Sequence, residues 1–201
     1  MTKGKKDLLI LVVVAAVFVW SAIKPHDYFT WFLEVFPAIF GFFLIIFTYR
    51  RFPLSTFTYA LIGIHAMILM LGGHYTYAEV PLGFWMENWF GFARNNYDKI
   101  GHLAQGFFPA LIARELLLRT SPLRPGKWLA VICVSIVGAI SALYEVLEWL
   151  VAVGSGTAAD AFLGTQGYVW DTQSDMALAF IGAIVALLLF SKYQNKFLLR
   201  N

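Results

Sequence analysis

Long apolar runs separated by short polar stretches dominate the pattern of hydrophobic and polar positions along the chain. A helix needs about 20 mostly apolar residues to cross a membrane. Six runs approach or reach that length, at about 7–23, 32–49, 55–74, 99–118, 127–150 and 174–191. They are too long and too continuous for membrane-spanning strands. The pattern therefore predicts an all-α integral membrane protein, a bundle of six transmembrane helices that forms a single domain over residues 1–201.

The composition agrees with a membrane protein. Of the 201 residues, 60% are hydrophobic and 13% are charged, whereas a soluble domain carries about 25% charged residues. The sequence pI is about 9.0, but the basic residues are spread over the loops between the apolar runs. We therefore expect membrane lipids as partners and no nucleic acid.

The basic residues lie mostly on one side of the expected membrane segments. With the N-terminus in the cytoplasm, twelve of the fifteen Lys and Arg residues fall on the cytoplasmic side, and only Lys24, Arg94 and Lys99 fall outside. Because short loops rich in Lys and Arg stay in the cytoplasm, this distribution predicts that both termini are cytoplasmic. The acidic residues are distributed the opposite way, since only Asp7 and Glu115 fall inside.

Two long loops fall on the outer side, at residues 74–96 and 152–171. The first contains Trp85 and Trp89 among other aromatic residues, which is typical of a segment that lies in the membrane interface. The second is rich in glycine and small polar residues. Loops of this composition on a rigid scaffold often carry function.

Two glutamates, Glu145 and Glu148, lie inside the fifth apolar run. A carboxylate in hydrocarbon costs roughly 2.5 kcal/mol or more, so such groups persist where they face a wet cavity, an opposite charge or a metal. Their spacing of three residues places both side chains on one face of a helix. The fifth helix therefore carries a polar face near its outer end.

Two other helices carry similar pairs of polar residues. Asp98 and His102 lie one turn apart at the outer start of the fourth run, and Asp171 and Asp175 lie one turn apart at the start of the sixth. His74 ends the third run at the same level. Because antiparallel neighbours bring these ends together, we expect the pairs to converge on one polar site.

Each of these residues also has a structural interpretation. Asp171 and Asp98 could cap their helices, since Asp before an apolar run is a favoured N-cap. The two glutamates could form an ion pair with Lys99 or Arg94. His65 is isolated in the third run, which favours a hydrogen bond between helices over a ligand role.

Carboxylates combined with imidazoles suit a divalent metal such as Zn²⁺, Mn²⁺ or Fe²⁺. The candidate ligands are His102, Glu145, Glu148 and Asp175, with His74, Asp98 and Asp171 as further candidates. The candidate catalytic residues are Glu145, Glu148 and His102. A bound metal could activate water at neutral pH, and without one a buried glutamate could act as an acid or a base.

Such a site is compatible with hydrolysis or group transfer on a lipid or a lipid-linked substrate. The chain contains neither H-E-x-x-H nor G-x-S-x-G, which excludes zincin-type proteases and α/β-hydrolases. Two alternatives stay open. The first is a proton- or cation-coupled transporter, although the almost purely apolar inner halves of the helices argue against a continuous path. The second is a non-catalytic membrane binding or scaffold protein.

Longer strings carry a resemblance to a known family. They are HAMILMLGGHYTYAEVPLGFWMENWFGFARNNYDKIGHLAQGFFPALIARELLLRTSPL, ISALYEVLEWLVAVGSG and AFLGTQGYVWDTQSDM. With these strings the chain resembles the YjdF-like proteins of the bacterial inner membrane over nearly all of its length after the first run. The resemblance implies a multi-pass protein of that membrane. It implies no reaction, because the family is one of unknown function.

Overall fold

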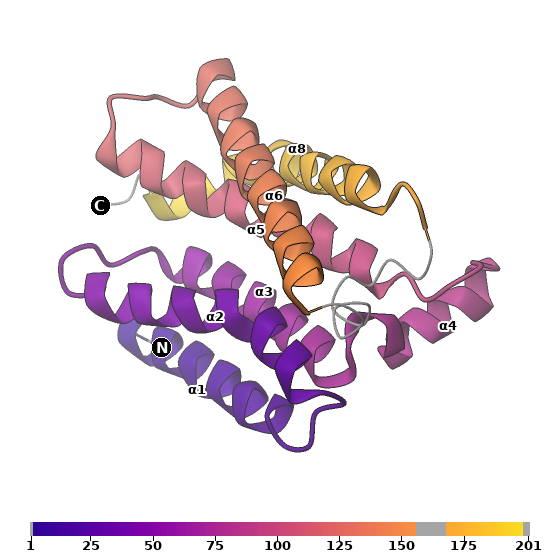
Figure 1. The fold of residues 1–201 in the computed structure, drawn as a ribbon. Coiled ribbons are helices and arrows are strands. Elements are labelled where there is room, and N and C mark those ends of the chain that lie inside the picture. The colour runs from indigo at the N-terminus through magenta and orange to yellow at the C-terminus, as the bar shows by residue number, and fades with distance from the viewer. Residues whose placement is uncertain (1, 156–167, 199–201) are drawn as a thin grey trace.

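The computed structural model describes residues 2–155 and 168–198, and within them the chain forms seven α-helices and one 3₁₀ helix (Figure 1). The elements are α1 (Lys3–Ser21), α2 (Tyr28–Thr48), α3 (Thr56–Tyr75), η1 (Tyr77–Glu79), α4 (Pro81–Phe90), α5 (Tyr97–Thr120), α6 (Lys127–Ser155) and α8 (Asp171–Leu198). The described residues contain no strand. The all-α class predicted from the apolar runs is thereby confirmed for this part of the chain.

Each of the six predicted apolar runs corresponds to one helix, with the run extending at most two residues beyond the helix: α1, α2, α3, α5, α6 and α8. Four of these helices, namely α2, α3, α6 and α8, are long and apolar enough to cross a membrane. The other two carry more charge: α1 begins with Lys3, Lys5, Lys6 and Asp7, and α5 has charged residues near both ends. The helices thus match the predicted runs, and four of them qualify as membrane spans by length and composition.

The six long helices form two groups of three. In the first group α1 and α2 pack against α3, and in the second α6 and α8 pack against α5. Contacts between α3 and α5 join the two groups. In Figure 1 the first group lies below the second. The helix α5 is therefore central, since it contacts α3, α6 and α8.

Small residues bring α5 and α8 into backbone contact. A Cβ atom at Gly106 of α5 would lie 1.9 Å from the backbone oxygen of Ala179, and one at Gly182 of α8 would lie 2.2 Å from that of Leu103. No real side chain fits at such distances, so both positions require glycine. Close approach through small residues is a common way for membrane helices to associate, and here it sets the first turns of α5 and α8 beside each other.

The beginnings of α2 and α3 follow from local capping. Asp27 is the N-cap of α2, and its Oδ2 accepts a hydrogen bond of 2.6 Å from the Thr30 amide. This hydrogen bond lowers the pKa of the exposed Asp27 carboxyl below its ordinary value of 3.8. Ser55 is the N-cap of α3 and accepts in the same way from the Thr58 amide. Side-chain acceptors of this kind satisfy amides that a helix leaves free at its start.

The structure describes one of the two predicted outer loops in full and the other only in part. Residues 81–90 of the first loop form α4, on which Trp85 and Trp89 are 56% and 69% exposed, as an interfacial segment requires. Gly91 ends α4 in the left-handed conformation with φ of 68°. Residues 156–167 of the second predicted loop, 152–171, lie outside the described residues.

An apolar core fills the middle of the second helix group. Leu111 of α5, Val137 of α6 and Ala183 of α8 belong to one cluster of buried hydrophobic residues. This core lies between the first turns of α5, which carry Asp98 and His102, and its last turns, which carry Arg114 and Glu115. The two ends of α5 are therefore two separate polar regions.

Candidate functional site

The start of α5, the end of α6 and the start of α8 bring five of the predicted site residues together. They are Asp98 and His102 on α5, Glu145 on α6, and Asp171 and Asp175 on α8. All four carboxylate residues are at most 8% exposed. Helices α5 and α8 begin at this site and α6 ends near it, which is the arrangement that the spacing of the polar pairs predicted.

Two cations bind the aspartates. Lys99 Nζ lies 2.7 Å from Asp171 Oδ1 and 2.7 Å from Asp175 Oδ1, and 3.4 Å from Asp98 Oδ2. Arg94 Nη2 lies 2.8 Å from Asp171 Oδ1. The sequence left open an ion pair of these cations with the glutamates, but their ion pairs within the described residues are with aspartates. Asp171 is the first residue of α8, and its carboxylate accepts from these two side chains.

The His102, Glu145 and Asp175 side chains form a second arrangement beside these ion pairs. His102 Nε2 lies 3.7 Å from Asp175 Oδ2, and His102 Nδ1 lies 3.9 Å from Glu145 Oε1. Glu145 Oε1 is buried and has no hydrogen-bond partner among the described residues. One ligand atom from each of the three residues lies within 4.8 Å of the others, so the group could hold a metal ion.

A second group of three acidic residues also has oxygens close enough together to hold a metal ion, but these oxygens contact Lys99. Asp98, Asp171 and Asp175 each offer an oxygen within 4.8 Å of the others. Lys99 contacts all three carboxylates. The lysine ammonium thus stands where a cation would lie, and the His102–Glu145–Asp175 group is the better candidate for a metal.

Glu148 faces a cavity that borders the candidate metal group. The cavity has a volume of about 210 Å³, and Glu34, Tyr144 and Glu148 contribute polar groups to its lining. Asp98 and His102 line it as well. Glu148 belongs to neither group of potential metal ligands within the described residues. The structure therefore separates the two glutamates: Glu145 lies with the potential ligands and Glu148 lies on the cavity wall.

His74 lies apart from this site. Its Nδ1 is 3.1 Å from the backbone oxygen of Ser21, and its ring packs at 4.4 Å, centroid to centroid, against Trp20. The sequence pattern predicted only that His74 ends the third run and did not predict its direction around the helix axis. Its described contacts are with the α1 end and its neighbour Tyr75 rather than with the aspartates or glutamates.

Two residues that line the cavity were not recognised as site residues from the sequence. Glu34 of α2 is 5% exposed and lies in an apolar run, which is the same signal that identified Glu145. His65 of α3 also lines the cavity, and its ring stacks on Phe108 at 5.4 Å between centroids. The hydrogen bond between helices expected for His65 is missing at Nε2, which is buried without a partner among the described residues.

Comparisons with known proteins agree with the resemblance found in the sequence. The protein family described as a predicted membrane protein (DUF2238) matches residues 7–196. The chain is 44% identical to the inner membrane protein YjdF of Escherichia coli strain K12 over 203 aligned residues, which cover 100% of this chain and 97% of that protein. No solved structure is a significant match. None of these descriptions includes a reaction or a ligand.

Proposed function

This chain belongs to the DUF2238 family of predicted membrane proteins, and we propose that it is a metal-dependent enzyme that acts on a lipid or a lipid-linked substrate. In this proposal α1 and α5 cross the membrane together with α2, α3, α6 and α8. Both termini are cytoplasmic, and the membrane is the bacterial inner membrane. The charge distribution supports the orientation, and the name of the Escherichia coli relative supports the membrane.

The proposal rests on Glu145 Oε1, which has no hydrogen-bond partner among the residues that the structure describes. A buried polar atom without a hydrogen bond costs about 1–3 kcal/mol, and more when it is charged. The neighbouring carboxylates avoid this cost through Lys99 and Arg94. An oxygen left without a partner beside His102 and Asp175 is explained if the three residues hold a Zn²⁺, Mn²⁺ or Fe²⁺ ion, whose preferred donors they supply.

Neighbouring residues orient the proposed ligands. Lys99 binds Asp175 Oδ1, which leaves Asp175 Oδ2 directed toward His102 Nε2. Gln105 Oε1 lies 3.3 Å from His102 Nδ1. A hydrogen bond donated by Nδ1 to Gln105 keeps the imidazole proton on Nδ1, so the lone pair of Nε2 is free to bind a metal. These two contacts restrain the Asp175 carboxylate and the His102 ring.

The cavity beside the ligands supplies the place for a substrate. The bound metal would supply a nucleophilic water at neutral pH. Glu148 faces the cavity and is the group that transfers a proton to or from the reacting atoms. His102 contributes to both regions, since it lines the cavity and belongs to the potential ligand group.

The helices around the cavity support a lipid as the substrate. Pro37 of α2 and Ile140 of α6 both line the cavity, yet α2 and α6 are not among the helix pairs that pack closely in the described chain. An acyl chain can therefore enter between them from the bilayer. The apolar core between the two ends of α5 favours a closed pocket over a transport path.

Metal analysis of the purified protein in detergent tests the proposal. We expect about one equivalent of Zn, Mn or Fe in the wild type and its loss in Glu145→Gln. Glu148→Gln is the matched control, since it removes a carboxylate one turn away on the same helix and should keep the metal. Substoichiometric metal in the wild type overturns the proposal. A Glu145→Gln variant that changes only thermal stability, with no metal in either protein, would indicate a scaffold role.

A further inference from the structure

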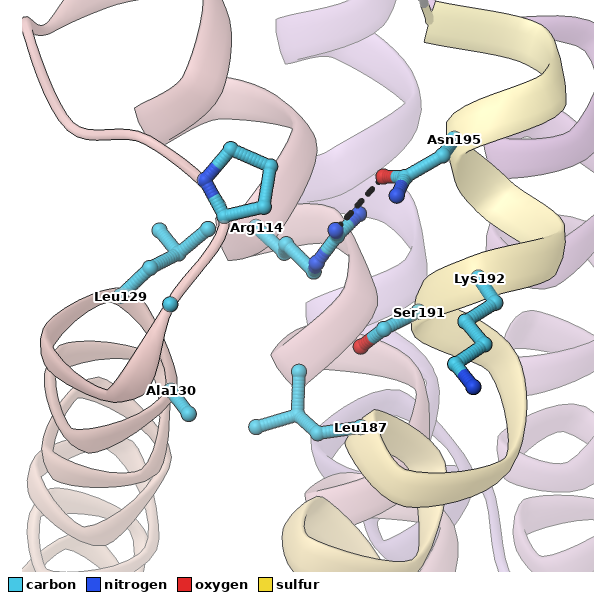
Figure 2. A pocket seen from close by; sticks show the side chains of 9 residues that line it. Arg114, Leu129, Ala130, Leu187, Ser191, Lys192 and Asn195 are labelled. Carbon is cyan, nitrogen blue, oxygen red and sulfur yellow. Dashed lines mark hydrogen bonds between the residues drawn. The ribbon is translucent and has the colours of Figure 1, made fainter.

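A second cavity, which we call the inner cavity, lies at the opposite end of α5 from the candidate site (Figure 2). Its volume is about 240 Å³, and α5, α8 and the start of α6 surround it. Its lining includes Arg114, Gly126, Ala130, Ser191, Lys192 and Asn195. Both charged residues in its lining are cations, Arg114 and Lys192. The inner cavity therefore has a positive wall.

Arg114 is a buried charge without an acidic partner in the described part of the chain. Its side chain is 3% exposed, and it donates hydrogen bonds to Gln194 Oε1 at 2.9 Å and to Asn195 Oδ1 at 2.6 Å. Within the described residues its acceptors are these two neutral amides, while the adjacent Glu115 pairs with Arg119. Because a guanidinium stays protonated in proteins and a buried charge is costly without a counter-charge, the arrangement calls for an anion.

The start of α6 adds to the positive character of the inner cavity. The cavity lining includes Gly126 and the first residues of α6. The first turn of an α-helix presents amides without partners inside the helix and the positive end of the helix dipole. Figure 2 shows the Ser191 hydroxyl on α8 pointing into the space between α8 and α6, next to Arg114. Arginine, a hydroxyl and a helix start together are the groups that bind phosphate in proteins.

We propose that the inner cavity binds a phosphate group, carried by a phospholipid headgroup or present as free phosphate. Its volume lies below the roughly 300 Å³ at which pockets for whole small molecules begin, which favours a single anionic group. The charge distribution predicts that this end of the bundle is cytoplasmic. Anionic headgroups of the cytoplasmic leaflet lie at that level.

Thermal unfolding of the purified full-length protein in detergent tests this proposal with two probes. The first is sodium phosphate compared with sodium chloride at equal ionic strength. The second is short-chain phosphatidylglycerol compared with phosphatidylcholine. We expect at least one anionic probe to raise the Tm of the wild type. A response to phosphate identifies the free ion as sufficient, and a response to phosphatidylglycerol alone identifies the headgroup.

Two variants and a control distinguish anion binding in the inner cavity from a general effect of charge on the Tm. Ala130→Leu fills the cavity from α6 without changing a charge, and Lys192→Gln removes one cation from its wall. The expected affinity loss for Lys192→Gln is about tenfold. Lys196→Gln is the control, because it removes an exposed cation one turn further along α8 that does not line the cavity.

The proposal requires that one of the two cavity variants loses the response while Lys196→Gln keeps it. No shift of the wild-type Tm with either probe overturns it. A shift that both Ala130→Leu and Lys192→Gln retain also overturns it, because the anion would then bind elsewhere. Arg114 itself is left unchanged in this design, since its replacement would also remove the hydrogen bonds to α8.

Discussion

Two buried glutamates, Glu115 near the end of α5 and Glu145 near the end of α6, have opposite environments. Glu115 is 0% exposed and accepts hydrogen bonds from the Ser55 amide at 2.8 Å, from the Ser55 hydroxyl at 2.7 Å and from the Thr58 hydroxyl. Arg119 Nη1 completes the set at 2.8 Å. Glu145 is 8% exposed, and one of its oxygens has no hydrogen-bond partner among the described residues.

The difference separates a structural carboxylate from a candidate for function. Every oxygen of Glu115 has partners from the protein, so its role is to tie the start of α3 to α5. Glu145 lies among groups that contact one another only at 3.7–3.9 Å, which is too long for a strong hydrogen bond. The burial of a glutamate therefore does not distinguish a structural role from a functional one. The hydrogen bonds that each carboxylate oxygen accepts do distinguish Glu115 from Glu145.

The largest expected effect is the loss of Glu115. We expect Glu115→Ala to lower the free energy of unfolding by about 3–5 kcal/mol, because it leaves the Arg119 charge and several polar groups near Ser55 without their partner. Glu145→Gln, measured with a chelator present, should change it by no more than about 1 kcal/mol. Thermal unfolding in detergent, followed by circular dichroism, measures both.

A reversed ranking would contradict the comparison. If Glu145→Gln destabilised the metal-free protein as much as Glu115→Ala does, Glu145 would be a structural residue with partners that the described contacts do not include. The proposed metal group would then lose its main support, while the role of Glu115 would be unaffected.

The second prediction concerns the cation that holds the aspartates. Lys99→Gln should lower the free energy of unfolding by about 1.5–3 kcal/mol, because Asp98, Asp171 and Asp175 lose their shared ammonium. These carboxylates already meet the distance criterion for a cation site. We therefore expect added Mn²⁺ to restore the Tm of the variant by more than it raises the Tm of the wild type.

Exposed Lys196→Gln serves as the control for general effects of charge. If Mn²⁺ raised the Tm of Lys99→Gln and Lys196→Gln equally, the aspartates would not form a cation site after the lysine is removed. The proposed difference between the three aspartates, which Lys99 neutralises, and the His102–Glu145–Asp175 group, which suits a metal, would then lack support.

The smallest expected effect comes from the exposed carboxylate of Asp27, which provides a reference for the buried ones. Its pKa is lowered below 3.8 by the hydrogen bond from the Thr30 amide. The stabilisation is therefore present above the unfolded-state pKa and is lost as the pH falls below about 4 through the folded-state pKa. We expect a loss of about 0.5 kcal/mol, at the lower end for N-caps, since the group is exposed.

Asp27→Asn is the matched variant for this pH series. Asparagine caps a helix as well as aspartate does but does not titrate, so its cap should be insensitive to pH. The Tm difference between the wild type and Asp27→Asn should therefore change below about pH 4 and stay constant above about pH 5. A constant difference throughout would show that the cap does not depend on the charge.

The positions of the helices could be predicted closely because apolar length alone determines them. The fourth predicted run, 99–118, corresponds to α5 (Tyr97–Thr120), and the fifth, 127–150, corresponds to α6 (Lys127–Ser155). The interfacial segment around Trp85 was predicted by its aromatic residues and forms α4. Charges at the ends of α1 and α5 keep these two helices from qualifying as spans by composition.

The site was predictable only in part. Spacing along each helix placed His102 and Glu145 at one level, and the structure brings them together. Depth does not determine direction around a helix axis, so His74, at a similar depth, points elsewhere. Glu34 has no second charged residue and no histidine one turn away to reveal a face, so its approach to the cavity depends on tertiary packing that the sequence pattern does not contain.

The central helix α5 also has a consequence for biogenesis. Its charged residues Lys99 and Arg114 find partners on α8, namely Asp175 at one end and Asn195 at the other, and α8 follows α5 in the chain. Until α8 arrives, α5 carries unsatisfied charges that the lipid interior disfavours. If α5 crosses the membrane as proposed, we therefore expect its stable insertion to depend on α8, which is synthesised later.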